Sequence, residues 1–592
     1  MKTEINQRQV FFRLMKYAKP YWKSILFAFF LLLLTTAGEV LGPILVKMFI
    51  DDYLTPRTFP VGPITALAVA YLTIHIAKVV VSYFQLLKFQ EIALNIIQQL
   101  RIDVFSKVQS LGMRYFDRTP AGSIVSRITN DTEAIKEMFV EVLVNFIQSG
   151  FFLIGVFVAM FSLNVKLALF CTFILPIIFL IIRTYRKYSS VFYSDLRERL
   201  SQLNAKLNES LQGMAIIQVF RQQQRLRNEF AQINEKHYKA GIRNIKLDSL
   251  LLRPATDVVY VFSLILVLSY FGISSLNSPV EIGVLYAFIN YLDRFFEPVN
   301  QMMMRLSMFQ QAIVASSRVF NLLDEKEHEP KQGEANIEIE AGEIEFRNVY
   351  FSYDGKRDVL KNISFKVKPG ETIALVGHTG SGKSSIIHLL MRFYEFDRGD
   401  ILIDGRSIKE YPKAELRKKI GLVLQDPFLF FGTIRDNIRL HNKEMTEEEI
   451  IRAAQFVQAH SFIEKLPGQY DHQVVERGTT FSSGQRQLIA FARTIATNPK
   501  ILVLDEATAN IDTETEEAIQ LALEKMRKGR TTIAIAHRLS TIQDADQILV
   551  LHQGEIVERG NHQQLLAKRG LYYKMYLLQN GLVEDVEHIQ HR

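Results

Sequence analysis

Residues 371–393, ETIALVGHTGSGKSSIIHLLMRF, decide the fold of the C-terminal half of this 592-residue chain. An apolar run of strand length, a glycine-rich loop and a helix-forming segment follow one another in that order. Glycines allow backbone N–H groups to close around a phosphate, and the positive N-terminal end of the following helix attracts the same anion. Lys383 is expected to reach the β- and γ-phosphates of a nucleotide, and Ser384 to ligate Mg²⁺. The nucleotide-binding residues predicted in this loop are Gly377, Thr379, Gly380, Ser381, Gly382, Lys383, Ser384 and Ser385.

Two apolar runs further along the chain end in polar residues suited to phosphate chemistry. Residues 500–512, KILVLDEATANID, place Asp505 and Glu506 at the end of a strand. Asp505 is expected to hold the Mg²⁺ shell through water, and Glu506 to act as the general base for the attacking water. The alternative, a carboxylate pair that only caps a helix, does not explain the phosphate loop. Residues 531–540, TTIAIAHRLS, predict another buried strand, after which His537 is placed to hydrogen-bond the γ-phosphate.

The N-terminal half has the composition of a membrane domain. The chain is 48% hydrophobic and 22% charged, which is too apolar for a wholly soluble protein and too charged for a wholly embedded one. Its single cysteine, Cys171, excludes an intrachain disulfide. An apolar helix needs about 20 residues to cross the hydrocarbon of a bilayer. The runs predicted as membrane spans are 24–49, 61–84, 138–161, 166–183, 250–276 and 282–304.

Basic residues mark the cytoplasmic side of these six spans. Lys and Arg are frequent before the first span and in the long connections 85–137 and 184–249. The connections on the opposite side have only Arg57. Because Lys and Arg near span ends remain in the cytoplasm, the N-terminus and the phosphate-binding half are expected there. The net charge of +8 is explained by this pattern, and nucleic acid is not expected as a partner.

Both cytoplasmic connections are too long for turns and are helical in period, so the helices are expected to extend beyond the bilayer. Breaks interrupt them at 116–131, FDRTPAGSIVSRITND, and at 208–222, NESLQGMAIIQVFRQ. Each break is either an ordinary bend or a docking element for the ATP-binding half. After Phe320 the composition becomes acidic and polar, as in a linker. The predicted organisation is a transmembrane domain at 1–320, a linker at 321–338 and a nucleotide-binding domain at 339–592.

Together these stretches resemble the ATP-binding cassette exporters of the fused type, over almost the whole chain. The resemblance implies a multi-domain fold, in which an all-α six-helix transmembrane domain precedes an α/β P-loop ATPase domain. It implies that Tyr353 stacks on adenine, and that Gln425 senses Mg²⁺, contacts the docking helices and takes part in catalysis. Glu476 resembles the acidic residue ahead of the family signature, and Asp512 the aspartate of a loop that crosses the dimer interface.

The signature of this family, usually LSGGQ, reads FSSGQ at 481–485, so that Ser483 replaces the first glycine. In the family two nucleotide domains pair head to tail, and the signature of one chain contacts the ATP held by the other. Ser483 is therefore expected to weaken the partner's ATP site, by about 1 kcal/mol for one lost hydrogen bond. The signature residues assigned to ATP binding are Ser482, Ser483, Gly484 and Gln485.

An altered signature beside complete hydrolytic residues resembles the catalytically complete member of a heterodimeric exporter, whose partner lacks the catalytic glutamate. Stretches such as 122–139 and 283–299 are similar to the B subunits of the Mdl-type multidrug-like exporters of bacteria. The resemblance implies ATP-driven export of small amphipathic compounds across the bacterial inner membrane. It also implies ATP and Mg²⁺ as cofactors, and membrane lipids and a second half-transporter as partners. The alternative is a homodimer that tolerates Ser483, such as a homodimeric lipid flippase.

The sequence encodes the transported substrate poorly. A non-transporting regulator is disfavoured by the intact general base, and an importer by the fusion of membrane and ATPase parts. Ionisable groups inside a membrane need a partner or water, so polar residues of the last span are candidates for a substrate cavity. Pairing with neighbouring helices is the alternative, as it is for Glu39 in the first span. The candidates are Asn290, Asp293, Arg294, Glu297 and Asn300.

Overall fold

The protein divides into two compact units. One comprises Met1–Gln109 with Ala121–Glu325, and the other comprises Ser110–Pro120 with Lys326–Arg592. The boundary at Glu325 lies inside the predicted linker, and a short segment of the first cytoplasmic connection belongs to the second unit. The computed structural model describes residues 7–276, 281–440, 442, 444–475, 478–505, 513–535 and 542–580, apart from the side chains of Arg253 and residues 513–515.

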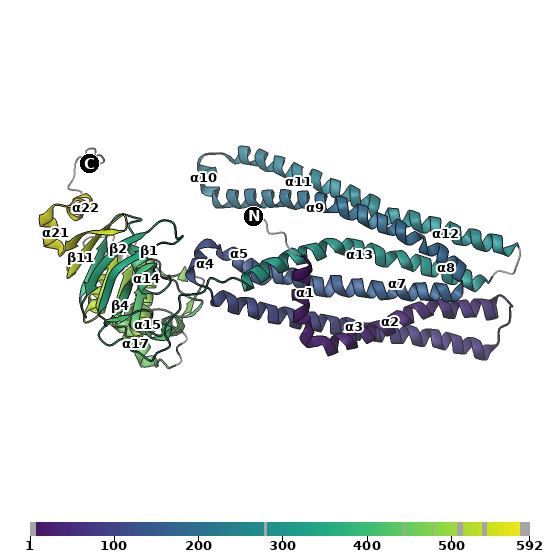
Figure 1. Cartoon of the computed structure of the whole chain (residues 1–592), viewed down its shortest axis with the longest axis horizontal. Helices are drawn as coiled ribbons and strands as arrows, with labels where there is room; N and C mark the ends of the chain where they lie inside the picture. The colour runs from purple at the N-terminus through teal and green to yellow at the C-terminus, as the bar shows by residue number, and fades with distance from the viewer. Residues whose placement is uncertain are drawn as a thin grey trace. The chain divides into compact units, whose positions relative to one another are not determined.

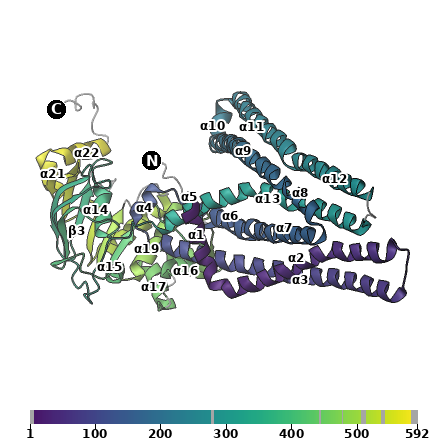
Figure 2. The ribbon, with the colours of Figure 1, turned by 45° about the vertical axis from the view of Figure 1, so that its right-hand side comes forward.

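In its described residues the first unit is helical, and its long helices run side by side (Figure 1). Helices α9 and α11 form a pair that is joined at its tip by the short helix α10 (Figure 2). The long helices are α2 (Trp22–Phe49), α3 (Val61–Gln109), α7 (Val144–Leu163), α9 (Ile174–Gln212), α11 (Gln223–Leu251), α12 (Arg253–Ser275) and α13 (Ile282–Leu323), and the shorter helix α1 (Gln7–Ala18) precedes them.

Short helical segments connect the long helices, and some of them lie within the two predicted breaks, 116–131 and 208–222. Asn164 ends α7, and its side chain accepts a hydrogen bond from the Leu167 N–H at 3.1 Å, which starts the next helix. Gly213 ends α9 and precedes α10 at the second predicted break. The short segments are α5 (Ala121–Ser126), α6 (Thr132–Glu137), α8 (Val165–Thr172), α10 (Met214–Val219), the 3-10 turn η1 (Lys19–Tyr21) and the π-helical turns η2 (Ile50–Leu54), η3 (Arg127–Asp131) and η4 (Met138–Leu143).

Among the described residues, five helical segments are long and apolar enough to cross a membrane. They contain the first five predicted spans, except for residue 276 at the end of the fifth. The sixth predicted span begins α13, a helix of 42 residues, and its charged residues Asp293, Arg294 and Glu297 make it less apolar than the others. The five segments are Gln7–Leu54, Val61–Gln109, Ala121–Leu163, Val165–Gln212 and Gln223–Ser275.

Polar contacts between helices fix the packing of α13 in this unit. The Tyr291 side chain is 1% exposed, and its hydroxyl donates to the Val40 carbonyl at 2.6 Å. The Asp51 carboxylate accepts from the Gly283 N–H at 2.6 Å. Because water is absent from the hydrocarbon core, such buried groups stabilise a helix pair only when each finds a partner. Helix α13 is therefore held against the first span although its own sequence is partly charged.

The second unit contains a six-stranded sheet with the order β12-β11-β3-β10-β9-β6. Strands β11, β3, β10, β9 and β6 are parallel, and β12 is an antiparallel edge. Every residue of β10 is buried, as expected for a parallel sheet that is covered on both faces. The carboxyl ends of β3 and β9 flank β10 at one edge, where ligands of such sheets bind. The bounds are β12 (Glu555–Gly560), β11 (Gln547–His552), β3 (Thr372–Val376), β10 (Thr531–Ile535), β9 (Ile501–Asp505) and β6 (Ile420–Val423).

Smaller sheets and surrounding helices complete this unit. The four-stranded sheet has the order β2-β1-β4-β5 and a stacked Phe346–Phe365 pair between β1 and β2, with ring centroids 4.5 Å apart. The strands are β1 (Ile344–Phe351), β2 (Leu360–Val367), β4 (Arg398–Ile403), β5 (Arg406–Ser407), β7 (Gly432–Thr433) and β8 (Gln473–Val474). The helices are α4 (Met113–Arg118), α14 (Lys383–Leu390), α15 (Lys413–Lys419), α16 (Ile434–Arg439), α17 (Glu447–Phe456), α18 (His460–Ile463), α19 (Ser483–Ala496), α20 (Thr513–Arg527), α21 (His562–Lys568) and α22 (Leu571–Gln579), with the 3-10 turn η5 (Gln469–Asp471).

Candidate functional site

The glycine-rich loop between β3 and α14 has a backbone that only glycine adopts without strain. Gly382 has a φ of 103°, and a Cβ built on it would lie 2.6 Å from the Leu360 Cδ2 atom. A Cβ on Gly377 would lie 2.3 Å from the Leu551 carbonyl oxygen. A Cβ on Gly380 would meet no atom within 4 Å, so this glycine faces open space. Gly377 and Gly382 therefore determine the conformation of the loop, and Gly380 leaves open space beside it.

Lys383 is buried at the start of α14, with 6% of the residue exposed. Its ammonium donates to the carbonyl oxygens of Gly377 at 2.7 Å and His378 at 3.2 Å. Burial lowers the pKa of Lys383, while the Asp505 carboxylate opposes this shift. The nearby Ser381 hydroxyl is buried and has no hydrogen-bond partner among the described residues. The buried Lys383 ammonium and the unpaired Ser381 hydroxyl lie in the same loop, and both are suited to bind a phosphate.

A cavity of about 510 Å³ opens beside this loop. This volume is in the range typical of small-molecule sites. Val359 and Ile535 add apolar wall to it. The predicted site residues that line this single cavity are Tyr353, Thr379, Gly380, Gly382, Lys383, Ser384, Ser385, Gln425 and Asp505.

Three oxygen donors of the cavity fit a magnesium ion. They are the Ser384 hydroxyl at the start of α14, the Gln425 amide after β6 and the Asp505 carboxylate at the end of β9. Mg²⁺ prefers oxygen ligands and keeps several waters, so it needs few protein ligands. No cluster of three His, Cys, Asp or Glu side chains that could hold a metal occurs among the described residues.

Tyr353, predicted beside the adenine, is tied to helix α14. Its hydroxyl shares hydrogen bonds with the Ser385 hydroxyl and with His388 Nδ1, each 3.0 Å long. The Tyr394 ring contacts it edge to face, with centroids 5.0 Å apart. Burial raises the pKa of Tyr353 and lowers that of His388. This contact of His388 could not be predicted from the sequence, because a histidine inside a helix has no distinguishing pattern.

Segment Ser110–Pro120 contacts the backbone of the same tyrosine. Arg114 in α4 donates to the Tyr353 carbonyl oxygen, at 2.7 Å from Nη2 and 3.2 Å from Nε. Its guanidinium also lies 3.4 Å from the Glu327 carboxylate. Sequence reasoning counted Arg114 only as a cytoplasmic charge, since its partner is 239 positions away in the chain.

The signature stretch starts helix α19. The Ser482 hydroxyl accepts from the Gln485 N–H at 3.2 Å, and the Gln485 side chain accepts from the Ser482 N–H at 3.1 Å. This capping box orients the first turn. Ser483 is the first residue of the helix, and no positive φ demands glycine there. Any effect of Ser483 must therefore come from its side chain rather than from backbone strain.

Several predicted residues cannot be placed in this site. Ser482, Ser483, Gly484 and Gln485 are not among the residues that line the cavity. Four predicted residues lie outside the described residues, so their roles stay predictions: Glu476, Glu506, Asp512 and His537.

The polar residues of the last span are partly engaged with other side chains or carbonyls. Asn300 accepts from the Thr256 hydroxyl at 3.0 Å, and Asn290 donates to a carbonyl of its own helix. Glu39 in α2 forms an ion pair with Lys78 in α3 at 2.7 Å. For Asn300 and Glu39 the structure favours helix pairing, the alternative to substrate contact, whereas the Asn290 hydrogen bond stays within its own helix.

Comparison with known proteins agrees with the division of the chain into these two units. Residues 25–299 match the ABC transporter transmembrane region, and residues 360–509 match the ABC transporter family. The chain is 47% identical to the putative ABC transporter ATP-binding protein exp8 of Streptococcus pneumoniae serotype 4, over 99% of this chain and 100% of that protein. It is 40% identical to the multidrug resistance-like ATP-binding protein MdlB of Buchnera aphidicola subsp. Schizaphis graminum, over 96% and 97% of the two chains.

A solved structure is also similar over nearly the whole chain. The structure of a bacterial Atm1-family ABC exporter with ATP bound has a TM-score of 0.78, is 29% identical, and covers 94% of this chain and 98% of that chain. The predicted fold class, a helical transmembrane domain followed by an ATPase domain, is therefore confirmed. The chain belongs to the ATP-binding cassette transporters, as a multi-pass exporter chain whose ATPase domain couples ATP hydrolysis to transport.

Proposed function

We propose that this chain is one half of a bacterial exporter of small amphipathic compounds, and that its partner is a non-identical half-transporter. One observation carries the need for a partner. The phosphate-loop residues line one cavity, whereas the signature residues of the same chain lie outside it. A second nucleotide domain, paired head to tail with this one, supplies its own signature to that cavity.

Exposed apolar surfaces on both units support such a partner. At the tip formed by α10, Val219 is 75% exposed and Phe220 is 68% exposed. On the ATPase unit, Phe431, six residues after Gln425, is 81% exposed. Large apolar side chains grouped at a surface mark protein contacts more often than open solvent. In the proposed complex the partner chain covers these surfaces.

The altered signature supports a non-identical partner. In a homodimer Ser483 would enter both ATP sites, whereas in a heterodimer it enters only the site held by the partner. The hydrolytic residues of this chain then serve an ATP that contacts the partner's signature. The similarity to the protein named MdlB, described as multidrug resistance-like, supports the same assignment and the proposed substrate class.

The residues around the cavity have defined parts in the proposed cycle. Lys383 and the loop N–H groups hold the β- and γ-phosphates. Ser384, Gln425 and Asp505 hold Mg²⁺, directly or through water, and the ion stabilises charge on the phosphate oxygens. Glu506 orients and deprotonates the attacking water, and His537 hydrogen-bonds the γ-phosphate; these two assignments rest on the resemblance.

Membrane orientation follows the distribution of basic residues. We place the N-terminus, both long connections and the ATPase unit in the cytoplasm, and the spans in the bacterial inner membrane. ATP binds the closed pair of nucleotide domains more tightly than the open pair, and this difference drives the outward opening of the spans. Hydrolysis then releases the closed state.

Inverted membrane vesicles that contain the complete complex test this function. We expect ATP-dependent uptake of an amphipathic dye, and a loss of about 100-fold in ATP turnover for Glu506→Gln with ATP binding retained, since a general base contributes at least that factor. The matched control Glu517→Gln, on the exposed face of α20, is expected to behave as the wild type. Uptake that is independent of ATP, or full turnover in E506Q, would contradict the proposal.

A further inference from the structure

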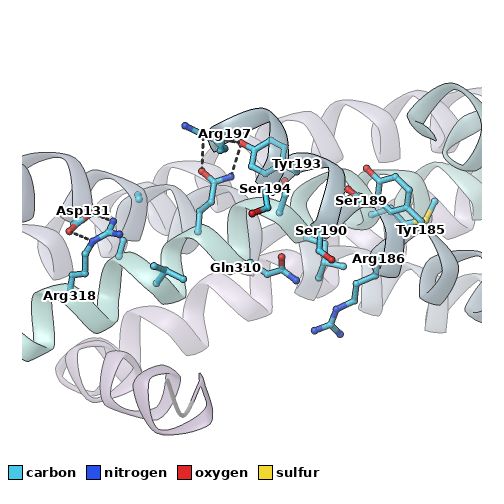
Figure 3. A pocket seen from close by; sticks show the side chains of 17 residues that line it. Asp131, Tyr185, Arg186, Ser189, Ser190, Tyr193, Ser194, Arg197, Gln310 and Arg318 are labelled. Atoms are coloured by element: carbon cyan, nitrogen blue, oxygen red, sulfur yellow. Dashed lines mark hydrogen bonds and ion pairs between the residues drawn. The ribbon is translucent and has the colours of Figure 1, made fainter. Parts of the chain in front are cut away.

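A second cavity, of about 540 Å³, lies in the membrane unit between α9, α13 and the segment η3–α6 that precedes the third span (Figure 3). Its described lining contains three arginines but one acidic residue, Asp131. None of the five polar candidates of the last span lines it. The residues that α13 contributes come later in that helix, from Met303 onward.

One stripe of α9 forms a wall of this cavity. Arg186, Ser190, Tyr193 and Arg197 recur at intervals of three or four residues, so they lie on one face of the helix. The stripe covers about 16 Å, at 1.5 Å per residue. It therefore presents a cation at each end, with hydroxyl groups between them.

The facing stripe of α13 changes from apolar to polar along its length. Met303 is buried and Leu306 is half-buried, and both line the cavity near the predicted end of the sixth span. Gln310 and Gln311 follow, one to two turns further from that span. An occupant of this cavity thus meets apolar atoms on its membrane side and amide groups on the opposite side.

The arginines of the cavity differ in how their charge is balanced. Arg318 is neutralised, because its Nε donates to the Asp131 carboxylate at 2.9 Å. Arg197 contacts only neutral groups, the Tyr193 hydroxyl at 2.9 Å and the Gln311 side-chain oxygen at 3.0 Å. Among the described residues Arg186 has no hydrogen bond or ion pair, and Figure 3 shows it extending from α9 without one.

Acidic groups on neighbouring faces are already engaged. Asp195, on another face of α9, binds Arg199 at 3.2 Å and Arg243 at 3.5 Å. Asp248 of α11 accepts from the Tyr185 hydroxyl at 3.0 Å. The cavity therefore holds two guanidinium groups that no carboxylate of the described residues balances. Guanidinium groups pair strongly with carboxylate, phosphate and sulfate, to which they donate two parallel hydrogen bonds.

We propose that this cavity binds the anionic headgroup of an amphiphile, as the site where the transported substrate enters from the cytoplasmic leaflet. The inference rests on the proposed export function and names the substrate class more narrowly. Arg186 follows the fourth predicted span by three residues, which places it at headgroup level. The headgroup contacts Arg186 at that level, Arg197 adds positive potential at the polar end of the cavity, and the apolar chain extends past Met303 and Leu306 toward the hydrocarbon.

Direct binding to the complete complex in nanodiscs, without nucleotide, tests the proposal. The probes are radiolabelled dodecyl phosphate, dodecyltrimethylammonium as a cation of equal chain length, and inorganic phosphate as a headgroup without a chain. We expect saturable binding of dodecyl phosphate only. Arg186→Gln is expected to weaken it about tenfold, which corresponds to about 1.4 kcal/mol, and Arg197→Gln to weaken it less, because Arg197 acts at a distance. Lys187→Gln, a neighbour on α9 that does not line the cavity, is the matched control and should bind as the wild type.

Each contrary outcome of this experiment overturns the proposal. Equal binding of the dodecyl cation would show that the arginines do not select charge, and equal binding of inorganic phosphate would show a plain anion site. Unchanged binding in R186Q and R197Q would place the amphiphile elsewhere. Arg186→Lys retains the charge but loses the paired donors, so it should bind more weakly than the wild type and more tightly than R186Q, which separates lost charge from misfolding. Because the assay needs no ATP hydrolysis, a complex that binds the amphiphile but does not pump refutes only the proposed function.

Discussion

Replacing Gly382 by alanine tests whether the phosphate loop is shaped by its glycines. At a φ of 103° an L-residue is strained by at least about 1–2 kcal/mol. The new Cβ would also lie 2.6 Å from Leu360 Cδ2, and Leu360 is fully buried, so it cannot swing away. Overpacking of this kind costs about 1–3 kcal/mol. We expect a total destabilisation of about 2–5 kcal/mol, from these two terms.

Gly380→Ala is the matched control in the same loop. Its φ is 83°, and no atom lies within 4 Å of the added Cβ, so only the backbone strain of about 1–2 kcal/mol applies. In calorimetry of the complete chain, the ATPase unit of G382A should therefore melt about 2–12 °C below that of G380A, at roughly 2–4 °C per kcal/mol. In contrast, G380A should weaken ATP binding, since its Cβ projects into space beside the cavity. Equal melting temperatures for the two variants would refute this account of the loop.

Three further perturbations probe the site and its surroundings. Arg114→Ala removes the hydrogen bonds to the Tyr353 carbonyl and should weaken ATP binding about 3- to 30-fold in a direct titration. Arg118 lies further from the same carbonyl, at 3.4 Å, so Arg118→Ala should change ATP binding little. Ser483→Gly should raise ATP occupancy or turnover at one of the two sites of the purified complex, and no change at either would remove the support for unequal sites. The pKa of His388 is lowered by burial, so the folded state binds fewer protons than the unfolded state. The stability of the fold therefore decreases as the pH drops below about 6.5 through the folded pKa. The melting temperature of His388→Gln should depend less on pH, which thermal scans from about pH 7.5 to 5.5 would check.

Local pattern predicted the phosphate-binding side of the site. The spacing of the loop glycines and Lys383 predicts the backbone geometry of the loop. Six of the eight predicted loop residues line one cavity with Gln425 and Asp505, whereas Gly377 and Ser381 do not line it. The strand order that brings Asp505 near the loop follows from parallel pairing of β3, β10 and β9. Such features depend on neighbours in sequence and on general rules of α/β sheets.

Contacts between segments that are distant in the chain could not be predicted from the sequence. Arg114 and Tyr353 have no shared pattern, and the inclusion of Ser110–Pro120 in the ATPase unit depends on contacts made only after folding. The polar residues of α13 were ambiguous for a related reason. A single helix does not reveal which neighbour faces it, so the pairing of Asn300 with Thr256 was one of two open interpretations.

The subunit composition of the complex tests the central claim most directly. Native mass spectrometry should be made on the complex purified from its own host membrane through a tag on this chain. The account predicts a second polypeptide of similar size, in one-to-one ratio, whose residue at the position of Glu506 is not glutamate. Two identical chains would place Ser483 in both ATP sites and contradict the asymmetric exporter proposed for this protein.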